Sequence, residues 1–132
     1  MKYLLDTHTL LWTIGESDKL SESAKKVIKN QSNDIYVSAV NLWEIAIKCR
    51  IGKLDLNGLK LEELINVIEK MEIELISLSP EESISYGQLE ESSHKDPFDR
   101  MLIWQSIQRK MIIISKDHEF SKFEKYGLKL FW

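Results

Sequence analysis

Hydrophobic residues along the chain alternate between short unbroken runs and longer stretches in which they recur every three or four positions. Five runs have the Ile, Leu, Val and Tyr content of strands, and the isoleucine run near residue 113 has no polar alternation. Strands of that kind are covered on both faces of a sheet. The runs predict strands over Lys2–Leu5, Ile35–Ser38, Glu74–Leu78, Met111–Ser115 and Leu128–Phe131.

Helical patterns fill the stretches between these runs. Apolar residues over Leu61–Met71 follow i, i+3, i+4 and i+7 spacing, which predicts an amphipathic helix. Ser79-Pro80 and Asp96-Pro97 each pair a capping residue with proline at the first helical position, which predicts two further helix starts. Strands that alternate with helices predict an α/β fold with a mostly parallel sheet.

Length and charge narrow the class of protein. At 132 residues the chain can bury one core but is too short for two, so we expect a single domain over residues 1–132. A net charge of −3 argues against binding nucleic acid by bulk positive potential. It does not exclude a nuclease, which can contact phosphate through metal ions and a few local cations.

Targeting and redox signals are sparse. Cys49 is the one cysteine, which excludes an intrachain disulfide and a cysteine-based zinc site. No apolar stretch reaches membrane-spanning length, and the first residues have no signal-peptide pattern. We therefore expect a cytoplasmic protein that does not bind a membrane.

Four acidic residues stand where apolar runs end or on predicted helices. Asp6 follows the first predicted strand, Asp117 follows the fourth, and Glu44 and Asp99 lie on helices. Ligands of parallel sheets bind outside the carboxyl ends of the strands. Four carboxylates gathered there would repel one another and raise each other's pKa unless a divalent cation neutralised them. The arrangement predicts metal-dependent chemistry, and carboxylates with few imidazoles favour Mg²⁺ or Mn²⁺.

Three of these positions have structural explanations in helix capping. Asp6 and Asp117 can each cap a following helix, and Asp99 falls at the third position of the helix that Asp96 caps. Asp99 also extends that helix's apolar stripe, so we expect it to point across the sheet edge. Arg100, next to so many acids, is expected to pair with one of them rather than to contact phosphate.

The helix that carries Glu44 leaves its role open. A helical wheel places Val40 and Trp43 on the apolar side, Asn41 and Lys48 on the polar side, and Glu44 at the border. The simplest interpretation is an i, i+4 surface pair between Glu44 and Lys48, worth a few tenths of a kcal/mol.

The three histidines each lie near one of the four acids. They are His8, His94 and His118. We expect them to face solvent or to support the acids, and a site with histidine ligands for a transition metal is the less favoured alternative.

Four segments, YLLDTHTLLW, SAVNLWEIAIK, HKDPFDRMLIWQ and IISKDHEF, resemble the PIN-domain ribonuclease toxins of the VapC type. The resemblance runs in order over essentially the whole chain, and the combination of LLDTH with DPFDR is specific. It implies a three-layer α/β/α fold with a five-stranded, mainly parallel sheet. It also implies cleavage of RNA that depends on Mg²⁺ or Mn²⁺, a homodimer, and a cognate antitoxin that blocks the active site.

The resemblance also assigns residues. It places the family's acidic quartet on Asp6, Glu44, Asp99 and Asp117, with Asp6 and Asp99 as the principal metal ligands. Four residues are expected to support the quartet: Thr7, Asp96, Arg100 and Ser115. Asp96 belongs to the DPFDR subgroup, and Ser115 supplies a hydroxyl where the family often has threonine.

Two other classes of protein compete with a toxin nuclease: an aspartyl-phosphate protein, either a phosphatase or a receiver domain, and a silent binding module. An aspartyl-phosphate phosphatase of the haloacid-dehalogenase type would need a second aspartate two positions after Asp6, where His8 stands. A receiver domain expects an acidic pair before its phosphoacceptor strand, and none is present. The remaining alternative is a catalytically silent PIN-fold module that acts through a partner protein, against which the intact quartet argues.

Overall fold

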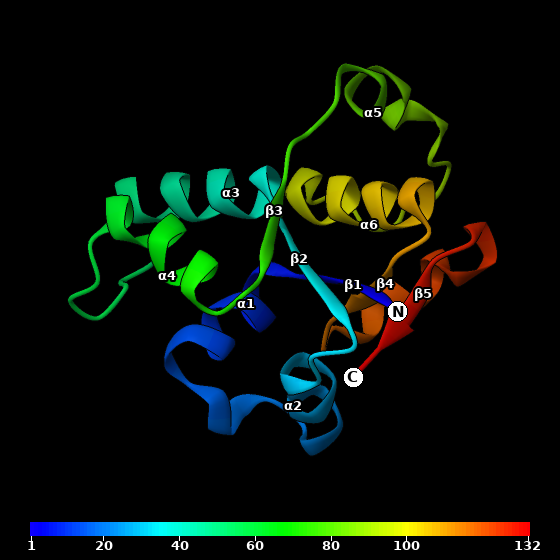
Figure 1. Cartoon of the computed structure of the whole chain (residues 1–132). Helices are drawn as coiled ribbons and strands as arrows, with labels where there is room; N and C mark the ends of the chain where they lie inside the picture. Colours follow the sequence, from blue (N-terminus) through cyan, green and yellow to red (C-terminus); the bar gives the residue numbers. More distant parts are fainter.

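The five apolar runs form one sheet in the computed structural model, which describes all 132 residues (Figure 1). The strands are β1 (Lys2–Leu5), β2 (Asp34–Ser38), β3 (Glu74–Ile76), β4 (Ile112–Ile114) and β5 (Lys129–Phe131). Their order across the sheet is β3-β2-β1-β4-β5, and every neighbouring pair is parallel. The predicted parallel sheet is confirmed, although the third, fourth and fifth strands are shorter than predicted.

Six α-helices connect and cover the strands. They are α1 (Thr7–Gly15), α2 (Glu22–Lys29), α3 (Ala39–Arg50), α4 (Leu64–Lys70), α5 (Pro80–Ser85) and α6 (Pro97–Arg109). Short 3₁₀ helices are added at Ser17–Lys19, Leu61–Glu63, Tyr86–Gln88 and His118–Tyr126. The amphipathic helix predicted over 61–71 is therefore a 3₁₀ turn continued by α4. None of the helices has the length and apolar character to span a bilayer.

Two hydrophobic cores lie on opposite faces of the sheet. Successive residues of a strand point to opposite faces, and in β1 Leu5 packs with Leu10 of α1 while Leu4 packs with Leu102 of α6. The first core also takes in residues of α2 and α4, and the second takes in the 3₁₀ helix His118–Tyr126. The expected three-layer α/β/α arrangement is confirmed.

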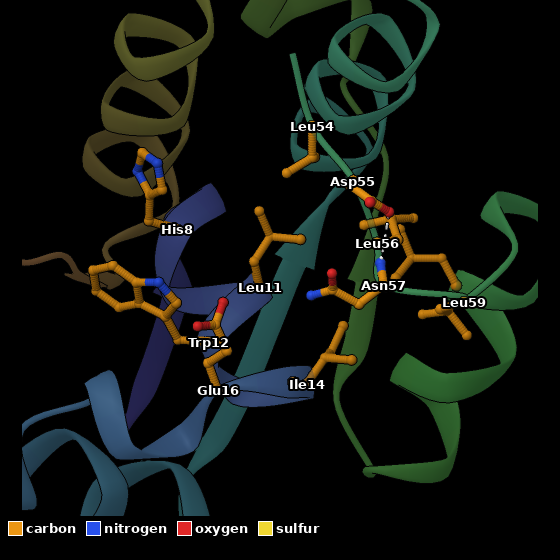
Figure 2. Close-up of a pocket in the computed structure, with 12 residues that line it drawn as sticks. His8, Leu11, Trp12, Ile14, Glu16, Leu54, Asp55, Leu56, Asn57 and Leu59 are labelled. Atoms are coloured by element: carbon orange, nitrogen blue, oxygen red, sulfur yellow. Dashed lines mark hydrogen bonds between the residues drawn. The ribbon is translucent and has the colours of Figure 1, made fainter. Parts of the chain in front are cut away.

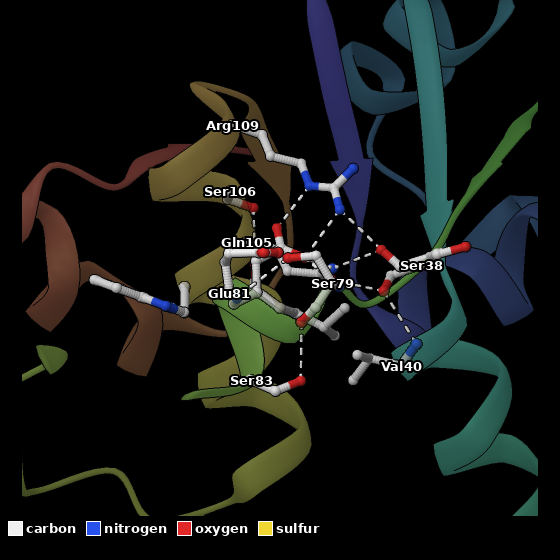
Figure 3. A network of polar contacts seen from close by, with 12 residues as sticks. Ser38, Val40, Ser79, Glu81, Ser83, Gln105, Ser106 and Arg109 are labelled. Atoms are coloured by element: carbon white, nitrogen blue, oxygen red, sulfur yellow. Dashed lines mark hydrogen bonds and ion pairs between the residues drawn. The ribbon is translucent and has the colours of Figure 1, made fainter. Parts of the chain in front are cut away.

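A polar network fixes α5 and the C-terminal part of α6 to the end of β2 (Figure 3). The buried Glu82 accepts hydrogen bonds from Arg109 at 2.7 and 2.9 Å and from Gln105 at 3.1 Å. Gln105 in turn accepts one from the Ser38 hydroxyl at 2.6 Å. Burial alone would raise the pKa of Glu82, but the hydrogen bonds from Arg109, Ser79 and Gln105 hold it at about 2.

Candidate active site

The carboxyl ends of β1 and β4 lie side by side and position the first of the acids. Asp6 continues the ladder, since its N–H donates to the Ile114 carbonyl at 3.2 Å. Its carboxylate accepts the Thr9 N–H at 2.8 Å, so Asp6 caps α1, and it also bonds the Ser115 side chain. Burial raises the pKa of Asp6 although these hydrogen bonds oppose the rise. Asp6 is thus both a helix cap and a buried carboxylate at the expected edge.

Ser115 links this carboxylate to the last acid of the predicted quartet. Its hydroxyl accepts the Asp117 N–H at 3.1 Å, and its side chain is buried. Asp117 is exposed and caps the following 3₁₀ helix by accepting the Glu119 N–H at 2.9 Å. The capping interpretation of Asp117 is therefore confirmed, and its second carboxylate oxygen takes no part in that cap.

Asp99 reaches the same edge from the first turn of α6. The Asp96 carboxylate caps this helix by accepting the N–H groups of Phe98 and Asp99 at 2.9 and 3.0 Å, as predicted. The Asp99 side chain is 25% exposed and lies 2.9 Å from His94 Nε2. Burial raises the pKa of Asp99 to about 6 against the effect of the His94 hydrogen bond, and the carboxylates of Asp96 and Glu44 add to the rise.

A histidine completes the closest grouping of ligand atoms. One atom each from His94, Asp99 and Asp117 lie within 4.8 Å of one another, which suits a single metal ion. The His94 ring is half-buried and packs edge-on against Phe120 and Phe123, with ring centroids 5.8 and 6.0 Å away. His8 and His118 are exposed and His94 contacts Asp99 directly, so each histidine either faces solvent or supports an acid, as expected.

The expected i, i+4 pair of Glu44 with Lys48 is present, but Glu44 is buried and does not lie on the surface. Its side chain is 4% exposed, and its two oxygens accept hydrogen bonds from Thr7 Oγ1 at 2.6 Å and from the Lys48 ammonium. Asn41, expected on the polar side, is fully buried and donates to Thr7 Oγ1 at 3.1 Å, whereas Trp43 is 60% exposed. The wheel failed because α3 contacts both cores, one through Val40 and the other through Ile45.

Arg100 does not pair with any of the acids, so that prediction is wrong. Its guanidinium donates to the backbone carbonyls of Leu89 at 2.7 Å and His94 at 3.0 Å, and also to that of Glu91. The Tyr86 hydroxyl accepts from Arg100 Nε at 3.1 Å. These three carbonyls belong to one loop, and Arg100 therefore fixes the loop that carries His94.

The site's residues fit a divalent cation. Asp99, Asp117 and His94 supply two carboxylates and an imidazole at ligand spacing, whereas Asp6, predicted as a principal ligand, is buried at the same sheet edge but is not in that group. The raised pKa values of Asp6 and Asp99 show carboxylates whose burial is not offset by a protein cation. His94 was missed as a ligand because its loop has no periodic pattern, and its position depends on contacts that Arg100 makes.

Comparison with known proteins places this site in a family. A PIN domain model matches residues 3–126, whereas no curated protein matches the chain. Among solved structures, the chain is similar to VapBC from Salmonella typhimurium bound to DNA, with a TM-score of 0.70, 20% identity and coverage of 99% of this chain and 97% of that one.

Two further solved structures are similar over nearly their whole length. VapBC2 from Rickettsia felis, bound to a promoter DNA fragment, has a TM-score of 0.67 at 20% identity and covers 99% of this chain and 98% of its own. VapBC-1 from nontypeable Haemophilus influenzae has a TM-score of 0.68 at 15% identity, with coverage of 99% and 97%. These likenesses concern the fold, while the family model spans nearly the whole sequence. The chain belongs to the PIN-domain family.

Proposed function

We propose that this PIN domain is a metal-dependent endoribonuclease and the toxin of a type II toxin–antitoxin pair. The observation that carries the proposal is the grouping of His94, Asp99 and Asp117 within 4.8 Å at the sheet edge where Asp6 is buried. The likeness to solved VapBC structures supports the toxin assignment. The sequence resemblance favours a cytoplasmic protein acting on RNA.

In this proposal the quartet of Asp6, Glu44, Asp99 and Asp117 forms the negative pocket for Mg²⁺ or Mn²⁺. Asp99, Asp117 and His94 would hold the ion, and the buried Asp6 would add negative charge from the end of β1. A divalent ion bound there supplies an acidified water and neutralises charge on the phosphate. The protein's own contribution is to hold these ligands rigidly: Asp6 by the start of α1, Asp99 by α6, and His94 by the loop that Arg100 binds.

The test is cleavage of single-stranded RNA by the wild-type protein in Mg²⁺ or Mn²⁺ and in EDTA. We expect cleavage only with metal, and its loss in Asp99→Asn. Asp34→Asn is a matched control, because Asp34 is an exposed aspartate at the start of β2, the end of the strand away from the site. A folded protein that binds metal but cuts no RNA would favour the silent binding module, and equal cleavage by Asp99→Asn would exclude the proposed site.

The proposed antitoxin contact is an apolar pocket beside α1 (Figure 2). Its lining includes Leu11, Trp12 and Ile14 of α1, which face Leu54 and Leu56 across a volume of about 190 Å³. His8 also lines the pocket, two residues after Asp6, so an amphipathic helix seated here could extend a basic residue toward the acids. We expect co-expression with the product of a neighbouring antitoxin gene to yield a complex that does not cleave RNA.

The proposed homodimer uses a different apolar surface, between α3, α5 and α6. Trp43 and Ile84 are 60% and 88% exposed, and a cavity of about 340 Å³ beside Trp43 is lined by Phe98 and Met101. Large exposed apolar side chains next to a cavity are typical of protein interfaces. Light scattering should report a dimer for the wild type and a monomer for Trp43→Lys, and a wild-type monomer would refute this arrangement.

A further inference from the structure

Lys48, the cation paired with Glu44 of the acidic quartet, has a role that its ion pair does not explain. Lys48 lies on α3, one turn after Glu44, and its ammonium pairs with the Glu44 carboxylate. The carboxylates of Asp96 and Asp99 also act on it and, after the Glu44 hydrogen bond, contribute to raising its pKa. Lys48 is therefore held in its charged form beside Glu44 and within the electrostatic reach of Asp99.

The ammonium has unused hydrogen-bonding capacity. A lysine ammonium carries three N–H donors, and the Glu44 carboxylate is the one acceptor that Lys48 has in the structure. Glu44 is buried, with 4% of its side chain exposed, whereas the Lys48 side chain is 36% exposed. The ammonium thus stands at the boundary between a buried carboxylate and solvent, with donors left for an incoming group.

A second ion pair in the same protein shows what a purely structural pair looks like. Arg109 lies on α6 like Asp99 but ten positions further on, about 15 Å at the helical rise of 1.5 Å per residue. Its guanidinium donates twice to the buried Glu82 and once to the Ser77 carbonyl at 2.8 Å. All the hydrogen bonds of the Arg109 guanidinium go to groups of the fold, whereas Lys48 makes one contact, with a carboxylate of the predicted quartet.

We propose that Lys48 is a catalytic residue of the nuclease, whose ammonium contacts a non-bridging oxygen of the scissile phosphate while Glu44 holds it in place. The inference rests on the proposed function and assigns it a further residue. A fixed cation beside the metal ligands would stabilise the charge that develops on the phosphate in the transition state. It would also reduce the repulsion between the carboxylates and the RNA backbone before the reaction begins.

This role predicts opposite changes in metal binding and in cleavage. Replacing Lys48 by methionine removes a positive charge near the ion, so we expect Mn²⁺ to bind about three- to tenfold more tightly. The same change should slow single-turnover cleavage at saturating Mn²⁺ by about 100-fold, the size of effect seen when one preorganised donor is removed. Lys48→Arg keeps the charge and should restore most of the rate.

The experiment measures Mn²⁺ affinity by isothermal titration calorimetry and cleavage of the RNA used above, in the wild type, Lys48→Met, Lys48→Arg and Arg109→Met. Arg109→Met is the matched control: it removes an ion pair from an equally buried carboxylate and should lower stability without changing Mn²⁺ affinity. Lys48→Gln, which keeps a donor for Glu44, replaces Lys48→Met if the latter does not fold.

The outcomes separate this inference from the proposed function. Tighter Mn²⁺ binding together with slow cleavage in Lys48→Met supports it. If Lys48→Met cleaves at the wild-type rate at saturating Mn²⁺, or binds Mn²⁺ as tightly as or more weakly than the wild type, the role of Lys48 is refuted. The proposed metal-dependent nuclease is not affected by that result. If the wild type cleaves no RNA, or cleaves it no faster than Asp99→Asn does, the proposed function is refuted, and with it the role of Lys48.

Discussion

Replacing Asp99 by asparagine should make the metal-free protein more stable. A pKa of about 6 in the folded protein, against an ordinary value of 3.8, means that the ionised carboxylate disfavours folding. At 1.36 kcal/mol per pKa unit this corresponds to about 3 kcal/mol at neutral pH. Asparagine keeps a buried polar group that can still accept from His94, so we expect a gain of about 1–2 kcal/mol.

The sign of the effect fixes its pH dependence. Ionised Asp99 opposes folding fully above its folded-state pKa of about 6, and this opposition disappears as pH falls toward 3.8. Urea unfolding in EDTA should therefore show Asp99→Asn more stable than the wild type at pH 7.5 and the difference nearly gone at pH 4. A variant less stable than the wild type at pH 7.5, or a difference independent of pH, would refute the argument.

Glu82→Gln is a control for which we expect the opposite change in the free energy of unfolding. The folded-state pKa of Glu82 is about 2, below its ordinary value of 4.5, so the ionised form stabilises the fold. Its contribution, about 3 kcal/mol by the same conversion, is complete above pH 4.5 and is lost as pH falls through about 2. Glu82→Gln should destabilise the protein at pH 7.5 by about that amount, in the same assay in which Asp99→Asn stabilises it.

Three further predictions concern the groups around the site. Mn²⁺ at 100 times its dissociation constant should raise the unfolding free energy of the wild type by about 2.7 kcal/mol and have little effect on Asp99→Asn, which urea titration with and without metal would detect. Arg100→Met leaves three loop carbonyls without their donor, so hydrogen exchange should increase over residues 89–94 and Mn²⁺ affinity should fall; unchanged exchange would show that Arg100 does not fix this loop. Asn41→Ala should cost about 2 kcal/mol in urea unfolding, since its amide bonds the Leu5 carbonyl, Thr7 and the Ser38 N–H; a loss under 0.5 kcal/mol would count against it.

Local patterns were enough to predict the main elements and the three aspartate helix caps at the site. Strand ends follow from where an apolar run stops, so Asp6 could be placed at the sheet edge from sequence alone. Capping chemistry is equally local, and the caps of Asp6, Asp96 and Asp117 were all found as predicted. These features depend on residues within three or four positions of one another.

The errors concern contacts that a helical wheel or a single residue type does not encode. A wheel assumes one buried side, but α3 crosses from one core to the other, which buries Glu44 and Asn41 and exposes Trp43. Arg100 stands among acids in the sequence yet binds carbonyls of a loop that ends before α6 begins. His94 owes its place beside Asp99 to that loop, so no spacing rule could have identified it.

The two ends of α6 explain why this fold can hold an unfavourable site. At its C-terminal end Arg109 and Gln105 satisfy the buried Glu82 and hold its pKa at about 2, which stabilises the helix against α5 and β2. At its N-terminal end Asp99 lies half-buried with its pKa raised to about 6, which opposes folding until a cation arrives. Because one rigid helix joins both ends, the favourable pairing at one end holds the buried carboxylate in place at the other. In the proposed nuclease a metal ion would bind to ligands that are already positioned, and relief of the cost of burying the Asp99 charge would add to its affinity.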